Sequence, residues 1–178
     1  MSGHSKWHNI KRKKGVNDAA KSILFSKMSR LITVAARQGG GDVNANPTLR
    51  LAVQRAKDAR MPNDNIDKAI KKGTGEDTST HYEEVTYEGF GPEGGALLIK
   101  TITDNKNRTV SELRNIFNRA GGSLGGPGSA AYIFAQDPQN PTYKVTISHE
   151  DKAEAIDGLI ETLEDHDDVQ EVYHNYDF

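Results

Sequence analysis

The stretch YEEVTYEGFGPEGGALLIKTIT, residues 82–103, decides the fold class, because the periodicity of the chain changes where it begins. YEEVTYEGF (82–90) and ALLIKTIT (96–103) predict two strands, and the Gly/Pro-rich GPEGG (91–95) between them predicts a hairpin turn. The letters also match G-x-G-x-x-G over residues 89–94. A dinucleotide-binding loop opens a helix, however, whereas a strand follows here, so we interpret the match as a turn.

The residues that follow alternate between predicted helices and strands. The pattern predicts helices over 107–122 and 150–166, and strands over 129–136, 143–148 and 168–176. Together with the hairpin, this order predicts an α+β domain of the split βαβ (ferredoxin-like) kind over residues 80–178.

The residues before the hairpin predict three amphipathic helices, over 16–41, 44–60 and 61–73. Asn46 and Pro47 are a natural N-cap and first helical residue for the second helix, and Gly73 is a natural end for the third. Short helices of this kind need one another for stability, so we expect a three-helix domain. Its predicted span, with a basic N-terminal arm, is residues 1–75, and GTGEDTST (73–80) has the composition of a linker.

The charge is distributed unevenly along the chain. Residues 1–75 hold sixteen Lys and Arg against five Asp and Glu, a net charge of +11. Residues 76–178 hold seven against twenty, a net charge of −13, and the whole chain is −2. The first part therefore has the electrostatic character of a nucleic-acid-binding domain, and the second has an acidic, solvated surface.

Several other classes of protein are disfavoured. The chain has no cysteine, its apolar stretches are too short to span a membrane, and no apolar segment of a secretory signal follows the basic N-terminus. The acid-free residues 1–17 leave a transit peptide open, but they do not have the pattern of an Arg/Ser-rich amphipathic helix, and we expect a cytoplasmic protein. No nucleophile–base motif, phosphate-binding loop or His pair with metal-ligand spacing is recognisable. We therefore expect no enzymatic activity, no metal, no cofactor and no small-molecule substrate.

The arm GHSKWHNIKRKKG (3–15) carries five cations, two histidines and the only tryptophan of the chain. Its cations can contact phosphates, and Trp7 can stack on an unpaired base or instead anchor the arm on the helices. The segment KRKK also resembles a nuclear import signal. The candidate nucleic-acid-binding residues are these arm residues and cations expected off the apolar helix faces: Lys6, Trp7, His8, Lys11, Arg12, Lys13, Lys14, Lys21, Arg37, Arg55, Arg60, Lys71, Lys72 and Arg108.

The sequence leaves the kind of nucleic acid open. No recognition helix with base-reading residues at its start is evident, and an arm with a tryptophan suits unpaired RNA at least as well as DNA. A protein-interaction module that uses the acidic domain as its contact surface is a further hypothesis.

Six stretches together resemble the YebC/PmpR family over nearly the whole chain: SGHSKWHNIKRKKGVNDAAKSILFSKMSRLITVAARQGGGD, NPTLRLAVQRAKDARMPNDNIDKAIKKGTG, YEEVTYEGFGPEGGALLI, TDNKNRTVSELRNIF, GGSLGGPGSAAYIF and LEDHDDVQEVYHNYDF. The resemblance implies a helical N-terminal domain followed by α/β domains. It also implies one of two functions: DNA-binding transcriptional regulation, or action at the ribosome, where members relieve stalling on proline-rich stretches.

The sequence departs from the family pattern at one place. Family members carry an extra domain after the AAYIF-type strand, whereas here only AQDPQNPT (135–142) occupies that interval. The chain is therefore expected to lack the third domain, and with it any function which that domain carries.

Overall fold

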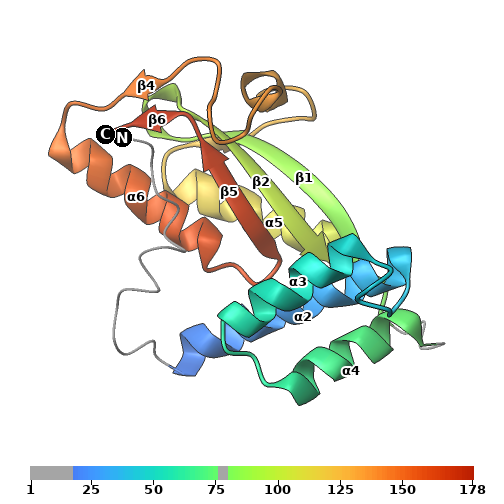
Figure 1. Cartoon of the computed structure of the whole chain (residues 1–178). Coiled ribbons are helices and arrows are strands. Elements are labelled where there is room, and N and C mark those ends of the chain that lie inside the picture. The colour runs from blue at the N-terminus through green and yellow to red at the C-terminus, as the bar shows by residue number, and fades with distance from the viewer. Residues whose placement is uncertain (1–17, 76–79) are drawn as a thin grey trace. The chain divides into compact units, whose positions relative to one another are not determined.

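A computed structural model describes residues 18–75 and 80–178 of the chain (Figure 1). These residues form two compact units. One is helical and ends at Glu83, and the other spans Glu84–Phe178. The arm, with its predicted binding residues, lies outside the described residues.

The helical unit contains α2 (Asp18–Gly39), α3 (Pro47–Asp58) and α4 (Asn63–Thr74). Asn46 caps α3 as predicted, since its side chain accepts a hydrogen bond from Leu49 N at 3.0 Å. The same side chain donates to the carbonyls of Ala35 and Gly40, at 2.8 and 2.9 Å. One buried amide therefore starts α3 and also satisfies carbonyls at the end of α2.

Helix α4 packs closely on α2, and it begins two residues later and ends one residue later than predicted. Gly73, expected to end the helix, lies inside it, and the cap is Gly75. A side chain at position 73 would meet Thr33 O at 2.5 Å and Ala36 Cβ at 2.7 Å. Gly73 therefore serves close helix packing rather than termination. The buried apolar residues of the unit are Met28, Ile32, Val34, Ala35, Ala36, Leu49, Ala52, Val53, Ala56, Met61, Ile66 and Ala69.

The second unit confirms the predicted α+β class. Its elements are β1 (Glu83–Phe90), β2 (Ala96–Thr103), α5 (Lys106–Arg119), β3 (Ser123–Leu124), β4 (Val145–Thr146), α6 (Glu150–Glu164), β5 (Val169–His174) and β6 (Tyr176–Asp177). The larger sheet has the order β3-β1-β2-β5, and β4 pairs with β6 in parallel. Helix α5 connects β2 to β3 with β1 between them, which is the split βαβ connection.

Helices α5 and α6 cover one face of the larger sheet (Figure 1). The core between them and the sheet contains Leu97, Ile99, Leu113, Phe117, Ile156, Leu159, Leu163, Val169 and Tyr176. The predicted hairpin turn is present as a short 3-10 turn, Pro92–Gly94, directly followed by β2. A side chain at Gly95 would come within 2.1 Å of the Tyr176 ring, so the turn needs a glycine there.

One prediction was wrong on the opposite face of the larger sheet. Residues 129–136, predicted as a strand, instead contain a 3-10 helix, Ala131–Phe134. The buried Glu88 of β1 explains the difference, because its carboxylate accepts hydrogen bonds from Gly128 N, Ala130 N and Ala131 N at 2.6–2.7 Å. These amides are therefore unavailable to a neighbouring strand.

The interval 135–142 is a closed loop. Thr142 N donates to Ile133 O at 2.9 Å, so the chain leaves and returns at the same place. Within the loop, the Asp137 carboxylate accepts hydrogen bonds from Gln139 N and from the Asn140 side chain. The predicted strand over 143–148 is reduced to the two residues of β4.

Candidate nucleic-acid interface

Half of the predicted binding residues are described by the structure. Lys6, Trp7, His8, Lys11, Arg12, Lys13 and Lys14 lie outside the described residues. Lys21, Arg37, Arg55, Arg60, Lys71 and Lys72 belong to the helical unit, and Arg108 belongs to the α+β unit.

Four of these cations are exposed on the helical unit: Lys21 on α2, Arg55 on α3, Arg60 just after α3 and Lys71 on α4. Lys21, Arg60 and Lys71 make no ion pair with any other residue that the structure describes. Residues 18–75 alone contain eleven Lys and Arg against five Asp and Glu. The unit therefore presents uncompensated positive charge to solvent even without the arm.

Arg60 is held in an unusual backbone conformation. Its φ is +62°, in the left-handed region that favours glycine. Met61 N donates to Ala56 O and Arg60 N donates to Lys57 O, both at 2.9 Å, which is the Schellman pattern at the end of a helix. An arginine at the usual glycine position is a local strain that keeps a cation on the surface.

Arg37 and Lys72, by contrast, contact the segment that follows the linker. Arg37 donates to Thr80 O at 3.3 Å, and Lys72 Nζ lies 5.1 Å from the centre of the Tyr82 ring. Arg30 lies over the same ring at 5.5 Å, so two cations contact one aromatic side chain. The sequence does not reveal this role of Tyr82, because nothing in the linker pattern indicates that residues 80–82 return to the helices.

Arg108 has a structural role that the sequence analysis did not predict. Its guanidinium pairs with the buried Asp168 at 2.8 Å and with Asp104 at 2.9 Å. Asp168, through a hydrogen bond and charge, raises the pKa of Arg108. The Thr109 hydroxyl donates to Asp168 Oδ2 at 2.7 Å. Arg108 therefore joins the start of α5 to the start of β5, and its charge is already compensated.

Helix α5 begins slightly earlier than the predicted residue 107. Its N-cap is Asn105, whose side chain accepts a hydrogen bond from Arg108 N at 3.0 Å. Thr109, in the first turn of the helix, is fully buried and contacts Asp168.

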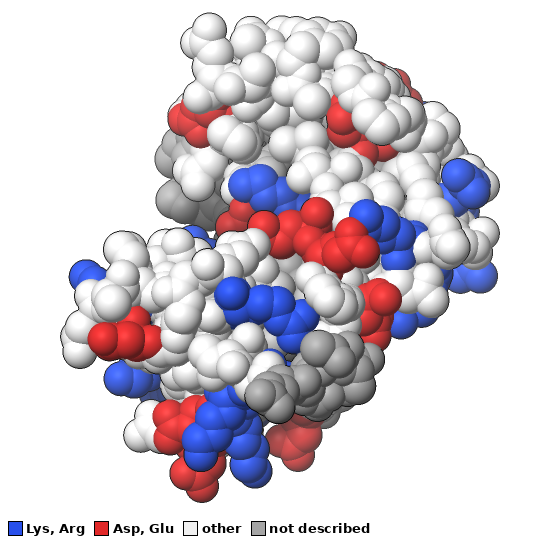
Figure 2. Space-filling view, turned by 90° about the vertical axis from the view of Figure 1, so that its right-hand side faces the viewer, with Lys and Arg blue, Asp and Glu red and all other residues white. Residues whose placement is uncertain are grey.

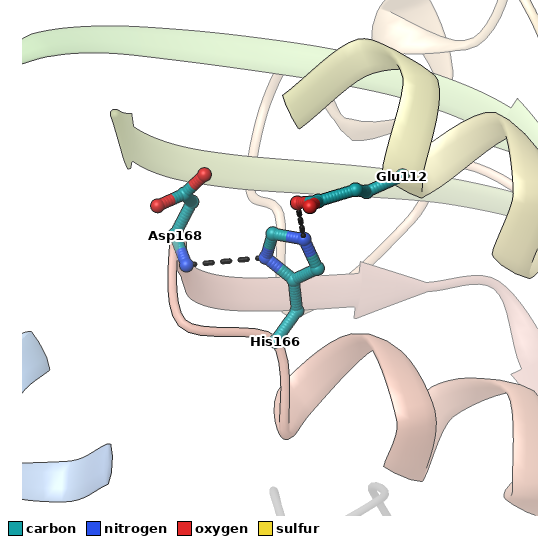
Figure 3. A group of neighbouring side chains, drawn as sticks. All are labelled: Glu112, His166 and Asp168. Carbon is teal, nitrogen blue, oxygen red and sulfur yellow. Dashed lines mark hydrogen bonds and ion pairs between the residues drawn. The ribbon is translucent and has the colours of Figure 1, made fainter. Parts of the chain in front are cut away.

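Glu112, His166 and Asp168 form a cluster beside this ion pair, with potential ligand atoms within 4.8 Å of one another (Figure 3). His166 Nδ1 accepts from Asp168 N at 3.1 Å, so the ring proton is on Nε2, which donates to Glu112 Oε2 at 2.8 Å. Arg108 lies against both carboxylates, with Nε 3.8 Å from Glu112. The cluster is thus an internally satisfied hydrogen-bond and ion-pair network.

On the face drawn in Figure 2, the Lys and Arg side chains of each unit reach the surface at several separate points. Among the helices that the structure describes, none is long and apolar enough to cross a membrane.

The protein thus consists of a basic helical unit followed by an acidic α+β unit. The positive charge of the helical unit suits a polyanionic partner. The chain belongs to the TACO1/YebC family. The TACO1/YebC N-terminal domain matches residues 5–76, and the TACO1/YebC second and third domain matches residues 82–139 and 136–176. Since the two latter segments meet at 136–139, the family residues between them have no counterpart here.

Individual relatives agree with this assignment. A probable transcriptional regulatory protein of Persephonella marina is 38% identical over 240 aligned residues, covering 99% of this chain and 96% of the relative. One of Rubrobacter xylanophilus is 59% identical over 135 residues, but the match spans only 54% of that protein and 75% of this chain. The crystal structure of a conserved hypothetical protein of Aquifex aeolicus has a TM-score of 0.86 at 33% identity, covering 97% of each chain.

Proposed function

We propose that the chain is a non-enzymatic regulatory factor that binds nucleic acid through its helical unit, with ribosomal RNA as the target and support of translation as the effect. The observation that carries this proposal is the exposed, uncompensated charge of Lys21, Arg60 and Lys71 on a unit with eleven cations and five acids. Phosphate contacts by such residues supply most of the affinity in sequence-independent binding.

Ribosomal RNA fits the character of this surface. Separate cations on α2, just after α3 and on α4 suit a folded RNA that offers several backbones, 2′-hydroxyls and unpaired bases at close range. The acidic unit, with seven cations and twenty acids in residues 76–178, is repelled by the same backbone and remains available for protein contact. Relief of stalling on proline-rich stretches, in the cytoplasm, is the translational role that the family resemblance suggests.

Promoter DNA is the second candidate, favoured by the names of the relatives, which are called probable transcriptional regulatory proteins. A dedicated reader of promoter DNA prefers its site by about 10³-fold or more over other sequences. We expect less than about tenfold preference here, because the exposed cations Lys21, Arg60 and Lys71 suit phosphates, and phosphate contacts carry no sequence information.

The first experiment tests the charged surface in the full chain. Lys21, Arg60 and Lys71 are replaced together by Gln, and affinity for a structured ribosomal RNA fragment is measured by fluorescence anisotropy at several salt concentrations. Loss of three phosphate contacts makes the log–log salt slope shallower by about two to three.

The matched control removes three cations from the other unit. Lys100, Lys144 and Lys152 each pair with an acid, at 3.3, 3.5 and 3.0 Å, and their replacement by Gln removes the same formal charge. An equal effect of the two triple variants would refute the assignment of binding to the helical unit.

The second experiment identifies the target. The protein is crosslinked to nucleic acid in cells and the recovered fragments are sequenced. Enrichment of ribosomal RNA supports the proposal, and enrichment of promoter DNA supports transcriptional regulation instead.

A further inference from the structure

A shallow groove of about 280 Å³ lies between α2 and the beginning of α4. Phe25, Ser26 and Ser29 of α2 line one side. Asn65 and Lys68 of α4 line the other, together with Met61 just before that helix. All six residues belong to the helical unit, so the groove is a feature of that unit alone.

Helical spacing explains why these side chains share one groove. Phe25 and Ser29 are four residues apart on α2, and Asn65 and Lys68 are three apart on α4, so each pair lies on one helix face. Met61 is buried, Phe25 is half-buried, and Lys68 is exposed. The groove thus combines an apolar part with polar groups.

The polar side chains of the groove lack partners. Within the described parts of the chain, the side chains of Ser26, Ser29, Asn65 and Lys68 form no hydrogen bond or ion pair. Asp64, one turn before Lys68 on α4, is not paired with it. Other cations of the unit are already engaged, such as Lys72 with Tyr82 and Arg37 with Thr80 O.

We propose that this groove binds one unpaired nucleotide of a single-stranded nucleic acid, with the base against Phe25 and the phosphate at Lys68. The proposal rests on the proposed function and adds a specific contact to it. The hydroxyls of Ser26 and Ser29 and the amide of Asn65 offer donors and acceptors for the base or sugar edges. None of these five residues was recognised from the sequence as a binding residue.

Size and chemistry favour a nucleotide over a protein segment. The volume of about 280 Å³ lies just below the roughly 300–1,000 Å³ usual for small-ligand sites, which suits a single nucleotide rather than an extended segment. A groove for an amphipathic helix is an apolar trough, whereas four of the six lining residues here are polar or charged. An aromatic face beside a cation is the common arrangement for binding an unpaired base together with its phosphate.

The test compares a single strand with a duplex, because only the single strand offers an unstacked base. The probes are a fluorescein-labelled (CA)6 RNA and a blunt duplex of the same length. Phe25→Leu keeps an apolar side chain of similar size but removes the aromatic face, and Lys68→Gln removes the cation. The matched control is Lys57→Gln, which removes one exposed cation from α3 away from the groove. Thermal unfolding of each variant checks that the helical unit remains folded.

We expect Phe25→Leu to weaken binding of the single strand about fivefold or more and to leave duplex affinity unchanged. Lys68→Gln should weaken the single strand more than the duplex, whereas Lys57→Gln should weaken both equally. Equal effects of all three variants on both probes, or no effect of the two groove variants on either, would overturn this inference while leaving the proposed function intact. A parent chain that binds neither probe nor the ribosomal RNA fragment would overturn both.

Discussion

Arg60 places a positive charge on the surface, but its backbone conformation lowers the stability of the helical unit. Its left-handed backbone, with φ of +62°, closes α3 at a position where glycine is unstrained. Replacement by Gly should therefore raise the stability of the helical unit by about 1 kcal/mol, and should also weaken nucleic-acid binding because a phosphate contact is lost. Thermal unfolding and anisotropy measurements on the same variant check both expectations.

Arg60→Asn separates the two effects, because Asn tolerates the left-handed conformation better than Arg but carries no charge. It should bind RNA as weakly as Arg60→Gly. If both variants bind as well as the parent, Arg60 is not part of the interface.

Glu88 provides a pH-dependent prediction. Burial raises its pKa, but the hydrogen bonds from Ala130 N, Gly128 N and Ala131 N together outweigh that effect and lower the pKa below its ordinary value of 4.5. The unfolded state consequently binds a proton more readily than the folded state, so the contribution of Glu88 is complete above about pH 4.5 and is lost as pH falls toward the folded-state value. Glu88→Gln should cost about 2 kcal/mol at pH 7 and flatten the acid side of the stability curve.

Urea unfolding between pH 7 and pH 3 measures this dependence. Glu84→Gln is the matched control, because Glu84 is an exposed glutamate of the same strand. It should leave the stability curve close to that of the parent. Parallel curves for the parent and Glu88→Gln would show that Glu88 does not contribute to the acid dependence.

Among the helices, strands and turns, the features that depend on residues close in sequence were correctly predicted. The features that depend on a partner far along the chain were not. The Asn46 cap and the hairpin turn use residues close in sequence, and both were correctly predicted. The 3-10 helix near Ala131 depends on Glu88, more than forty residues away, and was mistaken for a strand. Arg108 was assigned to nucleic acid because its buried partner Asp168 lies sixty residues further along the chain.

The close contact between α2 and α4 can be tested by a substitution at Gly73. Gly73→Ala improves helix propensity by about 1 kcal/mol, but its methyl group would lie 2.5 Å from Thr33 O. We expect a net destabilisation of about 1–3 kcal/mol, because the two helices must separate to admit the methyl group. Denaturant unfolding of the full chain measures this change.

Gly158→Ala is the matched control, since position 158 is exposed on α6 and has no neighbour within 4 Å of an added methyl group. This variant should be more stable than the parent by up to about 1 kcal/mol. A stabilising effect of Gly73→Ala as well would mean that α2 and α4 do not pack as closely as described.

For the whole molecule, the α+β class followed from the sequence, but the extent of the exposed positive surface did not. The charge counts located positive charge in the first part of the chain without showing which cations remain accessible. Lys72 and Arg37 contact Tyr82 and Thr80, whereas Lys21 and Lys71 remain accessible to a ligand. The groove beside Phe25 requires two helices that are separated by α3, and no single amphipathic pattern reveals it.

The hydrogen bond between Thr142 N and Ile133 O affects how well the fold tolerates insertions into the interval 135–142. Because it holds the ends of the interval 135–142 together, lengthening the interval costs mainly loop-closure entropy, which grows only with the logarithm of loop length. Inserting sixty Gly and Ser residues between Asn140 and Pro141 is about three doublings of loop length and should cost roughly 2 kcal/mol. Calorimetry should then show a lower melting temperature but an intact cooperative transition, whereas loss of the transition would show that the short loop is required. We therefore expect a permissive insertion point where the longer members of the family carry additional residues.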